Sequence, residues 1–388
     1  MKIAYVFHHD AANPAVQSGR PAALLHELAR QNHEVERIFP LAAQPSNAEF
    51  AKKVGYRLLR KHHRHDRHPE YLDALASQFN ARTGGRTFDL IFSPGSEVVS
   101  HLPAHLPVAY CADATFGNLV DYYWDFTGLS EEYLHQGFAQ EKAALERALL
   151  AVYPSEWAAR SAIEQHGADP ARVAVIPFGA NLGGDNRRAG IMAAIARRPA
   201  DTIRLLFVGR HWQRKGGDLV IATAMCLIAH GHRVTVDVVG CDVPAEYRSA
   251  AWIRAHGLLR QTEPAEMLAL RQLYAAAHFL FVPSRAEAYG LTFTEANAFG
   301  VPSIATNTGG IPAVVRNGHN GLLLPLSAQS SHYADAIVAA FSDPRRYEAM
   351  CHRAFAEFED RLNWPAFTRK FIDLAQERIA TLHAAPAA

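Results

Sequence analysis

Short apolar runs alternate with amphipathic stretches along most of the chain, and the runs end at a glycine, a proline or a polar cluster. Such runs predict buried strands of a parallel sheet, and the stretches between them predict helices. Strands are expected at 2–7, 33–39, 89–93, 107–111, 151–153 and 172–177 in the first half, and at 204–208, 233–239, 278–282 and 303–305 in the second. Strands that alternate with helices in this way predict two α/β domains.

A break in the alternation divides the two predicted domains. Residues 181–202 begin Asn-Leu-Gly-Gly-Asp-Asn-Arg-Arg, a composition typical of turns, so they are expected to form a linker. The domains then span residues 1–180 and 203–363. Residues 364–388 hold aromatic and aliphatic side chains at helical spacing, which predicts a final helix.

Composition narrows the class of protein. The 388 residues are enough for about two domains, and no apolar run reaches the roughly 18 residues that a membrane span requires. The formal net charge of +1 leaves no nucleic-acid footprint. The four cysteines are widely separated and follow no metal-binding or disulfide spacing. No metal site is therefore expected, and a reducing cytoplasm is the expected location.

Cationic side chains follow the predicted strand 204–208. A glycine ends the strand, Arg210 and Lys215 lie in the loop, and a helical pattern begins near Asp218. Two cations beside the start of a helix suit a leaving nucleoside diphosphate, on which negative charge builds as a glycosidic bond breaks. Arg214 lies next to Lys215 and is expected to contribute less.

Two acids follow the predicted strand 278–282. Glu287 lies in the loop after the strand, and Glu295 lies on a helix that begins near Leu291. Ligands bind at the carboxyl ends of strands in open parallel sheets. Gly290, between the acids, allows the backbone to approach a ligand closely, and the N–H groups at the helix start suit a diphosphate. An isolated pair of acids is more often a pair of solvated charges. The cationic loop after strand 204–208 favours a ligand site instead.

The frame around these acids resembles the Glu-x7-Glu signature of retaining glycosyltransferases of family 4. The frame includes Gly290, the run Ala-Phe-Gly-Val-Pro after the second acid, and a glycine pair at 309–310. The resemblance covers nearly the whole chain and is strongest over 151–325. It implies a GT-B architecture, in which two Rossmann-like domains face a central cleft and a C-terminal helix crosses back to the first domain.

The resemblance also implies roles for the site residues. Arg210 and Lys215 would neutralise the diphosphate of the donor, Glu295 would accept hydrogen bonds from its ribose, and Glu287 would position the transferred sugar. The donor is a co-substrate, and neither a metal nor a cofactor is implied. Backbone near the sugar and the phosphates would come from Ala288, Tyr289, Gly290 and Leu291.

Two positions in the first domain match the family less closely. Gly19 lies between the first strand and a helix, where the family has a loop near the donor phosphates or the transferred sugar. An ordinary turn is an equal alternative. Asp113 follows strand 107–111, where many family members have a histidine beside the transferred sugar. A carboxylate there could bind sugar hydroxyls or the acceptor, or it could cap a helix or a turn.

Residues 52–68 form a basic segment with seven Lys or Arg, four His and one acid. It fits either a solvated helix face or a peripheral contact with anionic lipid or a phosphorylated carrier at the inner face of a membrane. Its histidines, including His63, are expected to be surface charges because no pair of them has metal-ligand spacing backed by acids or thiols.

Together these features predict a metal-independent, retaining glycosyltransferase. It would move a hexose-type sugar from a nucleoside-diphosphate sugar to a hydroxyl acceptor such as a glycan, a glycolipid or a small molecule. A sugar-nucleotide epimerase or phosphorylase on the same fold, and a non-catalytic sugar-nucleotide or glycan-binding protein, are the alternatives. A glycosidase would use paired carboxylates but would not need a diphosphate clamp.

Overall fold

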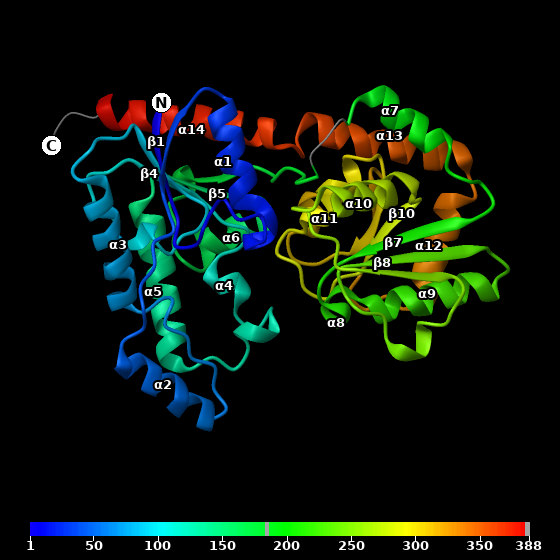
Figure 1. Ribbon diagram of the computed structural model, residues 1–388, viewed down its shortest axis with the longest axis horizontal. Coiled ribbons are helices and arrows are strands. Elements are labelled where there is room, and N and C mark those ends of the chain that lie inside the picture. Colours follow the sequence, from blue (N-terminus) through cyan, green and yellow to red (C-terminus); the bar gives the residue numbers. More distant parts are fainter. Residues whose placement is uncertain (183–185, 385–388) are drawn as a thin grey trace. The chain divides into compact units, whose positions relative to one another are not determined.

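The structure is a computed structural model that describes residues 1–182 and 186–384. The chain divides into two compact units. The first consists of Met1–Ile176 with the segment from Phe367 onward, and the second consists of Pro177–Ala366. Each unit holds a six-stranded sheet with helices packed against it (Figure 1). The predicted α/β fold class is therefore confirmed.

The sheet of the first unit has the order β2-β1-β3-β4-β5-β6, and its strands pair in parallel. Its strands are β1 (Lys2–Val6), β2 (Glu34–Ile38), β3 (Leu90–Ser93), β4 (Val108–Cys111), β5 (Leu150–Tyr153) and β6 (Val173–Val175). Its helices are α1 (Arg20–Arg30), α2 (Asn47–Leu58), α3 (Pro69–Thr83), α4 (Phe116–Leu119), α5 (Glu131–Arg147) and α6 (Glu156–Glu164). Strands β3, β4 and β5 are buried at every position, as expected for continuous apolar runs in a covered parallel sheet.

The sheet of the second unit has the order β12-β11-β10-β7-β8-β9, again with parallel pairing. Its strands are β7 (Ile203–Val208), β8 (Val234–Val239), β9 (Ile253–Gly257), β10 (Phe279–Val282), β11 (Ser303–Thr306) and β12 (Gly321–Leu324). Its helices are α7 (Arg188–Ala196), α8 (Trp212–Lys215), α9 (Gly217–Ala229), α10 (Pro264–Ala276), α11 (Leu291–Asn297), α12 (Ser330–Phe341) and α13 (Pro344–Asp360).

The last helix, α14 (Trp364–Ala384), contributes to both units. In the second unit its first residue, Trp364, donates a hydrogen bond from its indole to Asn181 Oδ1 at 2.8 Å. In the first unit Phe371 packs edge-on against Phe92 of β3, with 5.0 Å between the ring centroids. A final helix that returns to the first unit was predicted from the family resemblance, and the structure has it.

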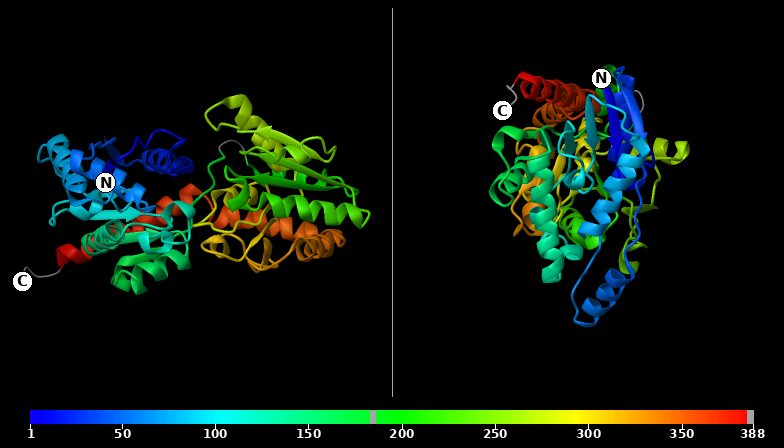
Figure 2. Two further views of the ribbon diagram at one scale, coloured as in Figure 1. Left: turned by 90° about the horizontal axis from the view of Figure 1, so that it is seen from below. Right: turned by 90° about the vertical axis from the view of Figure 1, so that its left-hand side faces the viewer.

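Helix α2 projects from the rest of the first unit, as Figures 1 and 2 show. Among the residues that the structure describes, no helix is long and apolar enough to cross a membrane.

The structure differs from the sequence-based expectations at two edge strands and in the expected linker. Strands β9 and β12 were not predicted, and β9 exposes its three central residues, so its apolar pattern is weak. The expected linker 181–202 lies in the second unit, and within it α7 buries Ile191 and Ile195. Residues 183–185 of that expected linker lie outside the described residues.

Candidate active site

The two motif-bearing loops leave neighbouring strands at the same edge of the second sheet. Strands β7 and β10 pair in parallel, with Leu205 opposite Phe279, so their carboxyl ends lie together. The loop after β7 spans 209–216 and includes the short helix α8. The loop after β10 spans 283–290 and leads into α11. The spacing along the sequence therefore becomes proximity in the fold.

Lys215 and Glu287 are joined by an ion pair between the two loops. Each side chain is only 10% exposed, so the pair is shielded from bulk water. The Ser284 hydroxyl donates to the same Glu287 oxygen at 3.4 Å, and the Arg214 guanidinium lies 3.7 Å from it. Arg214 also donates to the carbonyl of Ala286 at 2.8 Å. Glu287 is therefore close to two cations, Lys215 and Arg214, of which Arg214 was expected to contribute less.

Two glycines make this approach of the loops sterically feasible. A Cβ at Gly209 would lie 2.8 Å from Cγ of Lys215, so the glycine leaves room for the lysine side chain. Gly216 has φ +76°, and a Cβ there would lie 2.3 Å from the carbonyl oxygen of Pro283. A side chain at position 209 would displace Lys215 within its own loop, and one at position 216 would push the two loops apart.

An exposed ion pair adds a second connection between the loops. The Arg285 guanidinium donates to both oxygens of Asp218, at 2.9 Å and 2.7 Å. The backbone N–H of Arg285 donates to the carbonyl of Arg214 at 2.8 Å. No local pattern in the sequence pointed to this arginine, because its partner lies on α9 and is distant along the chain.

Glu295 is buried on α11 behind the ion pair. Its Oε2 accepts a hydrogen bond from the Tyr274 hydroxyl at 3.0 Å, and its Oε1 accepts one from the Gln261 amide at 3.3 Å. Burial raises the pKa of Glu295 to about 7, against the opposing effects of these two hydrogen bonds and of the positive charge on Lys215. Its charge therefore changes near neutral pH. No sequence signal pointed to Tyr274 or Gln261, since both precede β10 and reach Glu295 only through the fold.

Arg210 is exposed, unlike its neighbour Lys215. It makes no hydrogen bond or ion pair with the part of the chain that the structure describes. Its guanidinium is therefore available to an anionic ligand.

The segment between the two acids is placed by packing. Ala288 and Tyr289 are buried, and the Tyr289 hydroxyl donates to the carbonyl of Phe178 at 2.9 Å. The tyrosine side chain therefore has a structural role, and only its backbone remains for a ligand. Gly290 has φ +90°, a conformation that favours glycine, and Leu291 begins α11 half-buried.

In the first unit, the loop before α1 has left-handed backbone at three successive residues. The φ angles of Gln17, Ser18 and Gly19 are +45°, +56° and +82°. The buried Arg20 fastens this loop, because its guanidinium donates to the carbonyls of Pro94 and Cys111 at 3.1 Å each. Those carbonyls follow β3 and end β4, so Gly19 lies at the carboxyl edge of the first sheet.

Asp113 is exposed after β4, at the same edge. The N-cap of α4 is Thr115, whose hydroxyl accepts from the backbone N–H of Asn118 at 3.2 Å. The reading of Asp113 as a helix cap is therefore wrong. The carboxylate is left facing solvent.

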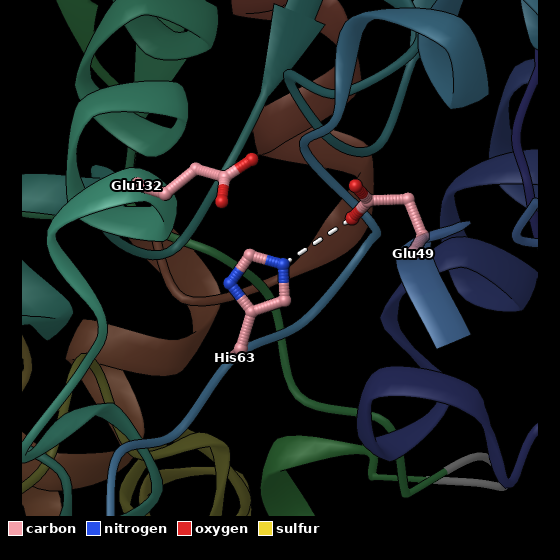
Figure 3. Close-up of side chains that lie close together, drawn as sticks. All are labelled: Glu49, His63 and Glu132. Atoms are coloured by element: carbon pink, nitrogen blue, oxygen red, sulfur yellow. Dashed lines mark hydrogen bonds and ion pairs between the residues drawn. The ribbon is translucent and has the colours of Figure 1, made fainter. Parts of the chain in front are cut away.

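Three side chains with metal-ligating atoms lie close together in the first unit. They are far along the sequence from the loops after β7 and β10. Ligand atoms of Glu49, His63 and Glu132 lie within 4.8 Å of one another (Figure 3). The ammonium of Lys52 pairs with both carboxylates, at 2.9 Å from Glu49. The positive charge that the two acids require is thus already supplied by the chain.

His63 in this cluster is buried, so the expectation that it is a surface charge is wrong. Its Nδ1 lies 2.8 Å from Ser130 Oγ and its Nε2 lies 3.2 Å from Glu49 Oε2, so both ring nitrogens have partners. The ring of Tyr56 stacks on it at 4.7 Å. The cluster, here called the α2 latch (Glu49, Lys52, Tyr56, His63 and Glu132), fastens α2 to α5.

Comparison with known proteins finds similarity in the second unit. Residues 192–356 match the family model of glycosyl transferases group 1, a range that includes both loops of the site. The D-inositol 3-phosphate glycosyltransferase of Geodermatophilus obscurus is 31% identical over 236 residues, which are 57% of this chain and 52% of that protein. The namesake from Nocardia farcinica is 32% identical over 213 residues, 51% of this chain and 46% of that protein. The chain thus spans about half the length of the curated relatives it matches.

Solved structures are similar over nearly the whole chain. Sucrose-phosphate synthase from Thermosynechococcus elongatus has a TM-score of 0.68 at 20% identity, with 98% of this chain and 100% of that chain covered. Anabaena Alr3699/HepE in complex with UDP has a TM-score of 0.62 at 18% identity, with 99% and 100% covered. These likenesses support the predicted GT-B fold. The family model supports the resemblance over residues 192–356, a segment that includes both loops and matches glycosyl transferases group 1.

Proposed function

We propose that the protein is a retaining glycosyltransferase that moves a hexose-type sugar from a nucleoside-diphosphate sugar to a hydroxyl acceptor. The observation that carries the proposal is the shielded pair of Lys215 and Glu287 at the joined carboxyl ends of β7 and β10, with Glu295 buried behind it. Similar structures are described as complexes with UDP and with UDP-glucose, which favours a nucleotide sugar as the donor.

In this proposal each polar group of the site interacts with a particular part of the donor. Lys215 and Arg210 neutralise the diphosphate, and Arg214 is close enough to assist. Glu295 accepts hydrogen bonds from the ribose hydroxyls. Glu287 positions the transferred sugar, and the backbone of 288–291 borders the sugar and the phosphates.

Transfer with retention needs no enzyme nucleophile if the acceptor attacks from the face of the leaving group. The bond between the anomeric carbon and the diphosphate oxygen breaks, and the acceptor oxygen forms the new bond on the same face. The proton of the acceptor hydroxyl passes to the departing phosphate oxygen. The side-chain cations stabilise the charge that develops on this oxygen, so the proposal includes no metal and no further cofactor.

The first unit supplies the acceptor side in this proposal. Gly19 and Asp113 lie at the carboxyl edge of its sheet, where open parallel sheets bind ligands. Asp113 is exposed, and it is assigned to the transferred sugar or to the acceptor. Names of curated relatives include D-inositol 3-phosphate, which favours a hydroxyl-rich acceptor here as well.

The test is turnover of purified full-length protein with a panel of nucleotide sugars and acceptors, with and without a chelator. A transferase yields a glycoside plus nucleoside diphosphate, and NMR of the anomeric proton reports retention. An epimerase converts the donor without an acceptor, a phosphorylase requires inorganic phosphate, and a binding protein shows no turnover. Inversion at the anomeric carbon, or activity lost with the chelator and restored by a metal, would refute the corresponding part of the proposal.

We further propose that α2 makes a peripheral contact with an anionic lipid surface. Phe50, Val54 and Leu58 recur every four residues on one face of α2 and are 63%, 48% and 82% exposed. The latch holds the helix from its other side. Apolar side chains bordered by cations are the chemistry that anionic bilayers bind. The neighbouring exposed side chains are Lys53, Arg57, Leu59, Arg60 and Lys61.

Sedimentation with vesicles tests this contact. The protein is expected to bind phosphatidylglycerol–phosphatidylcholine vesicles and to bind phosphatidylcholine alone much less. Leu58→Asn should weaken binding, whereas Leu382→Asn, at a position 57% exposed on α14, should not. Equal binding by the two variants and the unmodified protein would leave α2 a solvated helix.

A further inference from the structure

His8 lies just beyond β1 at the carboxyl edge of the first sheet, and part of its hydrogen-bonding capacity is unused in the protein. Its Nδ1 is completely buried and has no hydrogen-bond partner among the described residues. Its other ring nitrogen is not buried in this way. A buried polar atom without a partner is rare in native proteins and is often explained by a function. A histidine in this position can receive a ligand through the nitrogen that solvent reaches.

Glu97 lies beyond β3, the strand next to β1 in the sheet. Its side chain is 23% exposed, and one oxygen accepts from the Arg67 guanidinium at 3.3 Å. A Cβ at Gly95 would lie 2.7 Å from the other oxygen, so the glycine makes room for the carboxylate inside the loop. Burial acts to raise the pKa of Glu97, but the charge of Arg67 is the largest opposing effect and the pKa is lowered. Glu97 is thus an ionised acceptor of hydrogen bonds.

The nearby cations are already committed to the protein. Arg67 is buried between Glu97 and Glu141, with its guanidinium 4.8 Å from the centre of the Phe116 ring. Arg20 donates to two backbone carbonyls at this edge. Two carboxylates at this edge keep some exposure, namely Glu97 at 23% and, after the adjacent strand β4, the exposed Asp113. Such an edge repels a phosphate group and accepts hydrogen bonds from hydroxyls.

We propose that His8 and Glu97 form an acceptor subsite that binds hydroxyl groups of an uncharged polyol or sugar, an inference that rests on the proposed glycosyltransferase function. Glu97 accepts a hydrogen bond from one hydroxyl, and the accessible nitrogen of His8 bonds to a hydroxyl close by. Burial lowers the pKa of His8, although the charge of Glu97 opposes the shift, so the ring is neutral at pH 7. A neutral ring can both donate and accept.

Acceptor kinetics test the subsite. The acceptors are myo-inositol, D-glucose and D-fructose, each compared with its monophosphate ester, with the nucleotide sugar that most raises the melting temperature as donor. Glu97→Gln and His8→Gln are each expected to raise the KM for the best acceptor about tenfold or more, the loss of about 1.4 kcal/mol in binding. The affinity for nucleoside diphosphate, measured by calorimetry, should change less than twofold. The control is His26→Ala, which removes an exposed imidazole from α1.

Two results would overturn the subsite. One is an unchanged acceptor KM in both variants, and the other is a phosphorylated acceptor preferred over its neutral form by tenfold or more. If the variants do not fold, the unmodified protein with 15N-labelled histidine gives the answer. A neutral acceptor added with nucleoside diphosphate should shift the His8 ring signals, and unchanged signals would refute the contact. Failure of the proposed function would give a different result. No nucleoside diphosphate would then be released from any donor, either with an acceptor or with water alone.

Discussion

The ammonium of Lys215 is paired with the carboxylate of Glu287, although the two residues were expected to act on different parts of a donor. The pair joins the loops after β7 and β10 and is largely shielded from water. A diphosphate that approaches Lys215 must compete with Glu287 for the same ammonium. Arg214, 3.7 Å from the carboxylate, can keep Glu287 partnered while Lys215 turns to the ligand. The ammonium of Lys215 can thus exchange the carboxylate of Glu287 for the diphosphate of a ligand.

Removal of the lysine tests this exchange. Lys215→Ala is expected to lower turnover efficiency about 10- to 150-fold, since a hydrogen bond to a charged group contributes about 1.5–3 kcal/mol. Binding of free nucleoside diphosphate should weaken in parallel. Glu287→Gln should leave that binding intact or strengthen it, because it removes the competing anion, while turnover falls. Lys142→Ala, at an exposed site on α5, is the control, and equal kinetics for the two lysine variants would refute the diphosphate role.

The raised pKa of Glu295 predicts a dependence on pH. A carboxyl group with a pKa of about 7 in the folded state and about 4.5 in the unfolded state binds its proton more tightly when folded. Its contribution to stability is full below about pH 4.5 and is lost as the pH rises through about 7, with a slope of at most about 1.4 kcal/mol per pH unit. Glu295→Gln should remove this slope in urea unfolding of the second unit, and an unchanged slope would contradict the assignment.

Nucleotide binding should follow the same group with the opposite trend. Ribose hydroxyls donate more strongly to the ionised form of Glu295, so nucleoside diphosphate affinity is expected to rise as the pH increases through about 7. Calorimetry across this range measures the rise, and the rise should be absent in Glu295→Gln. A rise that persists in that variant would place the titrating group elsewhere.

Gly290 is expected to be intolerant of any side chain. Its φ of +90° is unfavourable for alanine, and a Cβ would lie 2.5 Å from the ring of Phe293. Gly290→Ala should therefore cost about 2–5 kcal/mol, from roughly 1–2 kcal/mol of backbone strain and 1–3 kcal/mol of overpacking. Gly257→Ala is the matched control, since Gly257 has φ +66° and nothing within 4 Å. Urea unfolding of both variants separates the two contributions, and equal losses would show that the contact with Phe293 is unimportant.

The α2 latch makes a local prediction. Glu49→Gln weakens its pairs with Lys52 and His63, so hydrogen exchange over 47–58 should accelerate while the rest of the first unit keeps its protection. Glu146→Gln, at an exposed site on α5, should change nothing. A melting temperature raised by stoichiometric zinc would instead show that the cluster prefers a metal ion to Lys52.

The sequence predicted all the strands of the first sheet and the central strands of the second sheet, and it missed β9 and β12 at the edges of the second sheet. Strands such as β10 are continuous apolar runs bounded by proline or glycine, so their pattern is unambiguous. Strand β9 has one buried residue and three exposed ones, so its sequence does not form an apolar run. It is a strand because it pairs with β8. Helix α7 was not predicted, because the first residues of the stretch 181–202 have a composition typical of turns. The apolar residues later in that stretch form the helix.

The candidate site was predictable where the chemistry follows a strand directly. Lys215 and Glu287 each follow a buried strand, and adjacency of those strands brings them together. The partners of Glu295 come from Gln261 and Tyr274, which precede a different strand and have no local signal. His63 was misjudged because its neighbours along the chain are exposed, while the acids that bury it come from α2 and α5.

Asp113 provides the test of the acceptor side. It is exposed after β4 and does not cap α4, so Asp113→Asn should leave the melting temperature unchanged. If its charge acts on the transferred sugar or on the acceptor, transfer should slow about tenfold or more, the loss of at least about 1.4 kcal/mol in the transition state. Nucleoside diphosphate binding should not change, because the residues assigned to it lie on the second sheet. Asp113→His, which restores the commoner family residue, should retain part of the activity. Normal transfer by Asp113→Asn would instead leave the acceptor side to His8 and Glu97, whose charge and hydrogen-bonding capacity do not depend on Asp113.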